Sequence, residues 1–157
     1  MEKKKTRLEN KIVEELKLWK SLSKKIVFTN GCFDLLHKGH LDLLHEASKF
    51  GDILLVGLNS DKSVKKLKGN SRPIEPQKVR KENLLKVKFI SDVIIFEELT
   101  PLKLINIIEP DFLVKGGDYK PNNIVGAKEI VKWGGVVKII KLTPGFSTTD
   151  SIKKSKL

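Results

Sequence analysis

The sequence predicts an α/β fold: one domain with a Rossmann-like, doubly wound parallel sheet of about five strands and an N-terminal helix. Two observations predict this class. Short β-branched runs alternate with helical stretches along most of the chain, an order typical of parallel sheets covered by helices on both faces. The length of 157 residues, 39% of them hydrophobic, suits a single domain with a single core.

The first half of the chain opens with a helix and then alternates strand and helix. From Leu8 to Leu22, apolar residues recur at three- or four-residue spacing, which predicts an amphipathic helix packed on the core. The β-branched run over residues 25–29 predicts the first strand, and a helical stretch over residues 39–50 follows it. The apolar run over residues 52–58, bounded by glycine and asparagine, predicts a second buried strand parallel to the first.

The second half continues this order. Two helical stretches, residues 61–68 and 76–89, flank a loop in which glycine and proline interrupt the pattern. Thr100 is predicted as the N-cap of a further helix that has Pro101 at its first position and ends before the next proline. The other predicted elements are strands over residues 92–96, 112–114 and 136–142 and a helix over residues 122–133.

The composition argues against a membrane-spanning or exported protein. No apolar run of about 18 residues occurs, and the N-terminus leads into mixed charge rather than an apolar secretory stretch. The only cysteine, Cys32, cannot pair within the chain, so neither a disulfide scaffold nor a cysteine-rich zinc site is expected. A reducing cytoplasm is therefore the expected compartment.

The net charge of +12 is unevenly distributed. Residues 1–25 hold nine basic and four acidic side chains, and residues 151–157 hold three lysines and no acid. Terminal lysines of this kind are usually solvated. Residues 61–90 hold ten basic side chains against three acidic ones, so this internal basic segment is the better candidate for binding an anionic ligand.

The residues after the first strand are the next to consider, because ligands of open parallel sheets bind beyond the carboxyl ends of the strands. Gly31 permits a tight turn and Gly39 permits close approach of a ligand, while the helix that starts there directs backbone N–H groups toward an anion. His37 and His40 are three residues apart, which on a first helical turn places both rings on one side. There they could donate hydrogen bonds to phosphate oxygens.

The same two histidines could equally hold a metal. A zinc ion would need further ligands, and only Asp34 or His45 is near in the sequence, with His45 expected to point elsewhere. Asp34 could instead hold Mg²⁺ through a water molecule or cap the helix.

The segment 31–40, Gly-x-Phe-Asp followed by His-x-Gly-His, resembles the signature of the cytidylyltransferase-like nucleotidyltransferases. Three further segments resemble one branch of that superfamily, the heptose 1-phosphate adenylyltransferases. These segments are residues 67–73, 113–120 and 145–149. The resemblance covers roughly residues 25–155 and implies a nucleotidyltransferase domain over residues 25–157, behind a tail and amphipathic helix over residues 1–24.

This resemblance implies transfer of AMP from ATP to a sugar 1-phosphate, D-glycero-β-D-manno-heptose 1-phosphate, by direct in-line attack with release of pyrophosphate. Mg²⁺ held mainly by the substrate phosphates is the implied cofactor, with Asp34 available to it through water. Many members carry a sugar-kinase domain in front, so a separate sugar kinase is expected to supply the substrate here. No nucleic-acid or membrane partner is expected, and relatives often dimerise, which leaves a homodimer open.

The resemblance also implies the site residues. The catalytic set, whose histidines contact the phosphates and whose cations contact the triphosphate, comprises His37, His40, Lys68 and Arg72. The nucleotide-binding set comprises Thr29, Asn30, Gly31, Phe33, Gly39, Lys115, Gly116, Asp118, Ser147, Thr148 and Thr149. A plain glycine turn at residues 115–118 and an N-cap at residues 147–149 are the structural alternatives. Arg80 is expected to add positive charge to the triphosphate site, whereas Lys65 and Lys66 are expected to form a solvated helix face.

Three other functions stay open. A cytidylyltransferase acting on glycerol phosphate or a related alcohol phosphate would use the same histidine motif, although residues 115–119 argue against it. A basic nucleic-acid-binding module would explain the charge, but it predicts interleaved aromatic residues, and residues 61–90 contain only Phe89. A domain that binds nucleotide without turnover is the third.

Overall fold

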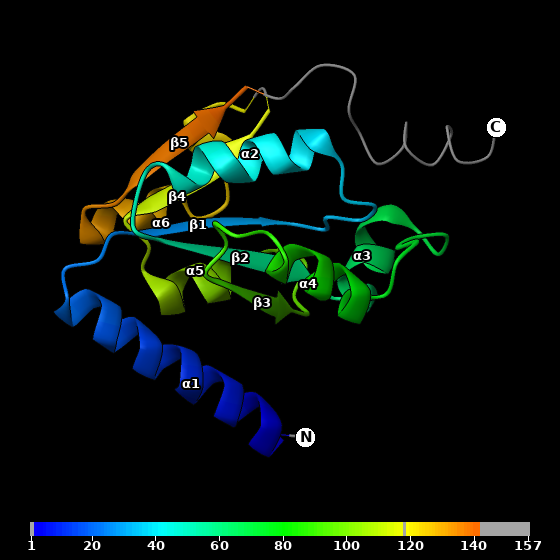
Figure 1. Cartoon of the computed structure of the whole chain (residues 1–157), viewed down its shortest axis with the longest axis horizontal. Helices are drawn as coiled ribbons and strands as arrows, with labels where there is room; N and C mark the ends of the chain where they lie inside the picture. Colours follow the sequence, from blue (N-terminus) through cyan, green and yellow to red (C-terminus); the bar gives the residue numbers. More distant parts are fainter. Residues whose placement is uncertain (1, 118, 142–157) are drawn as a thin grey trace.

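The computed structural model describes residues 2–117 and 119–141, with side chains from residue 11 onward (Figure 1). The strands are β1 (Ile26–Gly31), β2 (Ile53–Asn59), β3 (Asp92–Phe96), β4 (Phe112–Gly116) and β5 (Val136–Ile140). The helices are α1 (Glu2–Ser21), α2 (Lys38–Ser48), α3 (Asp61–Lys68), α4 (Gln77–Leu85), α5 (Leu102–Ile108) and α6 (Ala127–Ile130). The five strands form one parallel sheet of order β3-β2-β1-β4-β5, which confirms the predicted fold class.

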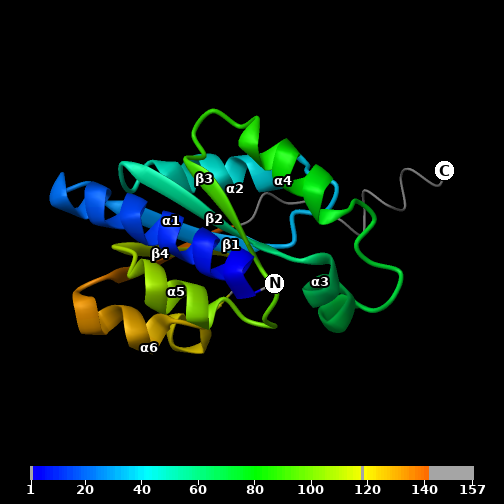
Figure 2. The same cartoon turned by 90° about the horizontal axis from the view of Figure 1, so that it is seen from below.

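Helices cover both faces of the sheet, with α1, α5 and α6 on one face and α2 and α4 on the other (Figure 2). Each face buries its own apolar cluster. Because neighbouring residues of a strand point to opposite faces, Phe28 of β1 belongs to the cluster under α1 and α5, and Val27 to the cluster under α2 and α4.

The N-terminal helix docks on the domain as predicted. Ile12 and Leu16, four residues apart on α1, are 7% and 4% exposed and join the cluster that contains α5. Burying two side chains of this size contributes about 1.5–3 kcal/mol each, so the helix is held mainly by this one stripe.

Three predicted helices differ from the structure. The helix predicted over residues 76–89 ends at Leu85 as α4, four residues early. The residue before α5 is Pro101, which makes no side-chain capping bond, so the prediction of Thr100 as N-cap is wrong by one position. The predicted continuous helix over residues 122–133 is also wrong. It is broken into the 3₁₀ turn η1 (Pro121–Asn123), α6 and the 3₁₀ turn η2 (Val131–Trp133), because Gly126 has a φ of +93° that no helix interior can contain.

Candidate active site

The sheet order creates a topological switch point between β1 and β4. From β1 the chain builds outward through β2 and β3, and then crosses to β4 and β5 on the other side of β1. The register pairs of β1 with β4 end at Phe28 and Leu113, three residues before the last residue of each strand, whereas β1 pairs with β2 as far as Gly31. Open parallel sheets bind ligands in the crevice at such a point. The residues that follow β1 and β4 are therefore the centre of the candidate site.

His37 and His40 stand together at the N-terminus of α2, of which His37 is the N-cap. The Nδ1 atom of each ring accepts a hydrogen bond from the backbone N–H of the other residue, both at 3.3 Å. The two rings are stacked, with centroids 3.7 Å apart and 17° between their planes. Since both Nδ1 atoms accept, this capping box assigns the proton of each neutral imidazole to Nε2.

Both histidines are neutral near pH 7. Burial, and then the charges of His37 and Lys68, lower the pKa of His40 to about 4, with an opposing contribution from a neighbouring carboxylate. Burial also lowers the pKa of His37. Phe33 packs edge-on against the His40 ring, with centroids 5.3 Å apart. The pair can therefore act as hydrogen-bond donors through Nε2–H without carrying a charge.

The loop between β1 and α2 is bent at two non-glycine residues in the left-handed region, Phe33 with φ +45° and Leu35 with φ +54°. This conformation costs roughly 1–2 kcal/mol per residue. Neighbouring contacts must hold it. Phe33 is 5% exposed and packs into the cluster under α2, while Leu35 donates its backbone N–H to the Glu75 side chain.

The Asp34 carboxylate fastens the same loop to the segment that follows α3. It accepts hydrogen bonds from Arg72 Nε at 3.1 Å and from the backbone N–H groups of Ile74 and Glu75 at 2.7 and 3.0 Å. Burial raises the pKa of this carboxyl, but these hydrogen bonds and the arginine charge outweigh burial and hold the pKa below its ordinary value. The alternative that Asp34 caps the helix is wrong, because His37 is the cap.

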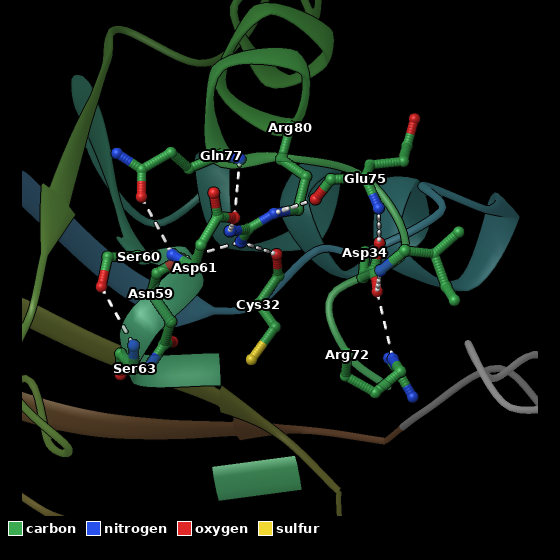
Figure 3. Close-up of polar contacts among 11 residues, drawn as sticks. Cys32, Asp34, Asn59, Ser60, Asp61, Ser63, Arg72, Glu75, Gln77 and Arg80 are labelled. Carbon is green, nitrogen blue, oxygen red and sulfur yellow. Dashed lines mark hydrogen bonds and ion pairs between the residues drawn. The ribbon is translucent and has the colours of Figure 1, made fainter. Parts of the chain in front are cut away.

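Arg80 lies at the centre of the polar network in Figure 3 and is completely buried. Its guanidinium donates to three backbone carbonyl oxygens and to the Asp61 carboxylate, at 2.8–2.9 Å. The three carbonyls belong to Cys32, Asn59 and Glu75. Arg80 thus ties the ends of β1 and β2 to the loop before α4. The expectation that it adds charge to a triphosphate site is wrong.

The other predicted cations are placed differently. Lys68 ends α3, is exposed, and is close enough to His40 for its charge to lower the pKa of that ring. Lys65 and Lys66 are exposed on the last turn of the same helix. The Arg72 side chain is 12% exposed, and its buried Nη2 atom has no hydrogen-bond partner within the described part of the chain.

The other side of the crevice is formed by the end of β4. Lys115 is partly buried there, which lowers its pKa, and the opposing effect of Cys32 on that pKa shows that the ends of β4 and β1 are close. The Lys115 ammonium lies 5.8 Å from the centroid of the Tyr119 ring. Gly116 completes β4 and is half-buried. The predicted residues Asp118, Ser147, Thr148 and Thr149 lie outside the described residues.

The remaining residues of the predicted nucleotide-binding set lie at the end of β1 and the start of α2. Thr29 is 1% exposed, and its Oγ1 has no hydrogen-bond partner among residues 2–117 and 119–141. Asn30 and Gly31 are half-buried at the end of β1, and Gly39 is buried in the first turn of α2. His45 contacts the Phe89 ring, at 5.2 Å, and is exposed.

The described residues do not build a protein-held metal cage. Within residues 2–117 and 119–141, no group of three His, Cys, Asp or Glu side chains is arranged to hold a metal ion. The Asp34 oxygens already accept three hydrogen bonds, and an arginine occupies the position beside them. This donor set fits a metal ion that enters on substrate phosphates better than one that the protein binds directly.

Sequence reasoning did not single out Glu75 or Asp61. Both are acidic residues within the basic segment 61–90, which holds only three acids. In the structure Glu75 accepts a hydrogen bond that joins two loops of the site, and Asp61 accepts one that joins α3 to α4. The sequence signal that could have drawn attention to these two residues is an acidic side chain within a segment of mostly basic ones.

A cavity of about 370 Å³ lies elsewhere, along the outer edge of β3, between α1, α4 and α5. None of the predicted site residues lines it. A search for helices able to cross a membrane, made over the described residues, found none.

Comparison with known proteins gives a consistent result. The profile of the cytidylyltransferase-like family matches residues 28–154. The chain is 50% identical over 145 residues to the bifunctional protein HldE of Koribacter versatilis, covering 92% of this chain and 30% of that protein. It is 51% identical over 146 residues to the bifunctional protein HldE of Haemophilus ducreyi, covering 93% of this chain and 31% of that protein. The chain thus spans about 30% of the length of these relatives.

Among solved structures, the lipopolysaccharide core biosynthesis protein from Thermoplasma volcanium GSS1 is similar, with a TM-score of 0.61 and 29% sequence identity. The match covers 76% of this chain and 97% of that chain.

Proposed function

We propose a specific reaction for this chain, which belongs to the cytidylyltransferase-like family and is a nucleotidyltransferase. The proposed reaction transfers AMP from ATP to D-glycero-β-D-manno-heptose 1-phosphate and yields ADP-heptose and pyrophosphate. The observation that carries it is the stacked, neutral pair His37 and His40 at the start of α2, beside the switch point and near Lys68. Similarity to the HldE proteins and to a lipopolysaccharide core biosynthesis protein supports the choice of a heptose.

The acceptor phosphate needs no general base. Its second pKa is about 6, so it is largely dianionic at neutral pH and can attack the α-phosphorus directly. A bond forms between the acceptor oxygen and the α-phosphorus while the bond from the α-phosphorus to the bridging oxygen breaks. The electron pair of that bond leaves with pyrophosphate. Catalysis then depends on in-line positioning and on stabilising charge on the phosphates.

The described residues suit these tasks. His37 and His40 present neutral Nε2–H donors, which can bind phosphate oxygens without an added desolvated charge. Lys68 is an exposed cation beside them, and Arg72 has a buried Nη2 group that makes no hydrogen bond within residues 2–117 and 119–141. We assign these two cations to the triphosphate. Mg²⁺ held by the nucleotide phosphates would supply charge neutralisation there.

The nucleoside is assigned to the other side of the crevice. Lys115 and Gly116 end β4 next to the end of β1, where Thr29, Asn30 and Gly31 lie. In the proposal, Asp118 and residues 147–149 complete this pocket, with Asp118 accepting from a ribose or sugar hydroxyl. A separate sugar kinase would supply the acceptor, and the cytoplasm is the proposed compartment.

A pyrophosphate-release assay over a panel of nucleoside triphosphates and sugar or alcohol phosphates tests the reaction. ATP with the heptose 1-phosphate should give the highest rate, and ATP should exceed CTP by at least ~100-fold in kcat/KM, because a pocket built on hydrogen bonds rejects a wrong base strongly. A preference for CTP with glycerol phosphate would establish the cytidylyltransferase alternative. Nucleotide binding without turnover, or salt-dependent binding of nucleic acid alone, would refute the proposal.

Histidine variants test the role of the pair. Replacing His37 or His40 by alanine should lower kcat by about 100-fold or more, which corresponds to about 3 kcal/mol of lost transition-state stabilisation. His45→Ala is the matched control, since His45 is exposed on the same helix and contacts Phe89 rather than the pair. Near-normal turnover of His40→Ala would remove the histidines from the mechanism.

A further inference from the structure

We propose that Glu75 is a positioning residue that holds the histidine pair in place for catalysis; this inference rests on the proposed function. The Oε1 atom of Glu75 accepts the backbone N–H of Leu35 at 2.9 Å. Leu35 lies two residues before the N-cap His37 and forty residues before Glu75 in the sequence. The carboxylate therefore joins the loop that presents the histidines to the loop that presents Arg72.

The Glu75 side chain is itself oriented from α4. Its second oxygen, Oε2, accepts a hydrogen bond from Asn83 Nδ2 at 3.3 Å. Its backbone makes two further bonds, donating to Asp34 at 3.0 Å and accepting from Arg80 at 2.9 Å. Any residue at this position can make the two backbone bonds. Only a side chain with an acceptor at the right reach can make the bond to Leu35, so substitution of Glu75 removes that contact and the weaker one to Asn83 while the two backbone bonds remain.

The bond to Leu35 matters because of the conformation of Leu35. Its φ of +54° is one that a leucine rarely adopts, so the loop is held away from its relaxed geometry. Without the bond, relaxation of Leu35 would rotate the peptide groups that lead into His37. The backbone N–H of His37 binds Nδ1 of His40, so such a rotation would disturb the geometry of both rings. Displacements of about 1 Å at reacting groups can cost orders of magnitude in rate.

The test compares Glu75→Ala and Glu75→Gln with Glu82→Ala, an exposed glutamate on α4, as the control. Steady-state kinetics and an NMR pH titration of the His40 ring are measured on each. Glu75→Ala should lower kcat by about 10-fold or more while the KM for ATP changes by less than about 2-fold. The pKa of His40, about 4 in the intact protein, should rise because a displaced ring gains water.

Glu75→Gln keeps an acceptor oxygen of similar reach and should recover most of kcat and the His40 titration, while Glu82→Ala should match the wild type. Wild-type kcat and titration in Glu75→Ala would overturn the positioning role, and so would equal losses of kcat in Glu75→Ala and Glu75→Gln. If Glu75→Ala does not fold, Glu75→Met decides, because methionine keeps a side chain of similar length but has no oxygen to accept the Leu35 N–H: the same upward shift of the His40 pKa supports the proposal, and an unchanged titration overturns it.

The two readouts separate this inference from the proposed function. The His40 titration needs no turnover, so it reports on positioning even in a protein that releases no pyrophosphate. Absence of pyrophosphate release by the wild type would refute the proposed reaction. Activity in the wild type that Glu75→Ala retains in full would refute only the role of Glu75.

Discussion

Replacing Arg80 by methionine should lower the free energy of unfolding by about 3–5 kcal/mol, as expected when a buried charged network loses one partner. Arg80 has no exposed surface, so its guanidinium is shielded from solvent in the folded protein. Methionine has a similar unbranched stem and fills much of the same space. The loss therefore comes mainly from the acceptors that the guanidinium leaves behind.

The magnitude follows from those acceptors. Three are backbone carbonyl oxygens, that of Asn59 in a buried bond and those of Cys32 and Glu75 in partly buried ones, and each acceptor left without a donor in such a place costs about 1 kcal/mol or more. The fourth is the Asp61 carboxylate, whose side chain is 35% exposed and can regain water, so it adds less. Arg80→Lys keeps the positive charge but cannot reproduce the planar fork that reaches all four acceptors, so it should lose about half as much.

The assay is urea unfolding at pH 7 followed by circular dichroism, with Lys78→Met as the control because Lys78 is exposed on the same helix. Lys78→Met should stay within about 0.5 kcal/mol of the wild type. If Arg80→Met were destabilised by less than about 1 kcal/mol, the network in Figure 3 would not fasten the loops, and the reasoning would be refuted.

Three further outcomes are expected. The folded-state pKa of His40, about 4, lies below its ordinary 6.5, so protonation of His40 should lower the free energy of unfolding by up to about 3 kcal/mol as the pH drops from 6.5 to 4, and His40→Gln should flatten the dependence over that range in urea titrations across pH. Lys68→Ala should lower kcat/KM for ATP by about 10-fold and Lys66→Ala by less than about 2-fold, because Lys68 is near enough to His40 for its charge to lower the pKa of that ring and is the lysine assigned to the triphosphate in the proposal; equal losses in steady-state assays would contradict this. Gly126→Ala should destabilise by about 2 kcal/mol in thermal unfolding, since its φ is +93° and a Cβ would lie 2.8 Å from Ile105 Cδ1; an unchanged melting temperature would show that the loop can relax.

The fold was predictable because its signals are local. Residues 61–68 and 92–96 have the predicted bounds of α3 and β3, where a helical pattern and an apolar run are each sharply bounded. The region around Gly126 was not predictable in this way. Its left-handed backbone lets it pack against Ile105 of a different helix, and that contact exists only after folding.

The candidate site likewise contains features that follow from local sequence and features that depend on contacts made only after folding. The histidine pair follows from a three-residue spacing at a predicted helix start, and the structure brings the two rings into contact. Whether a charge faces solvent or the interior does not follow from composition. Arg80 and Lys68 belong to the same basic segment, yet Arg80 is fully buried and Lys68 is exposed. Partners far away in sequence decide between the two, and a charge count cannot contain them.

The arginines and the lysines of residues 61–90 lie in different surroundings. Arg80 uses its fork to bind four fixed acceptors, and Arg72 binds Asp34 through Nε while its Nη2 makes no hydrogen bond within the described residues. Lysine is a flexible point charge, suited to a mobile polyphosphate, whereas the arginine fork holds a fixed geometry. Arg72 therefore helps to fix Asp34 in the loop between β1 and α2. That loop leads into His37, so it is held in place before any substrate binds. The proposed reaction, which has no covalent intermediate, would depend on such preorganisation, because its acceleration would come from groups already in position when charge develops.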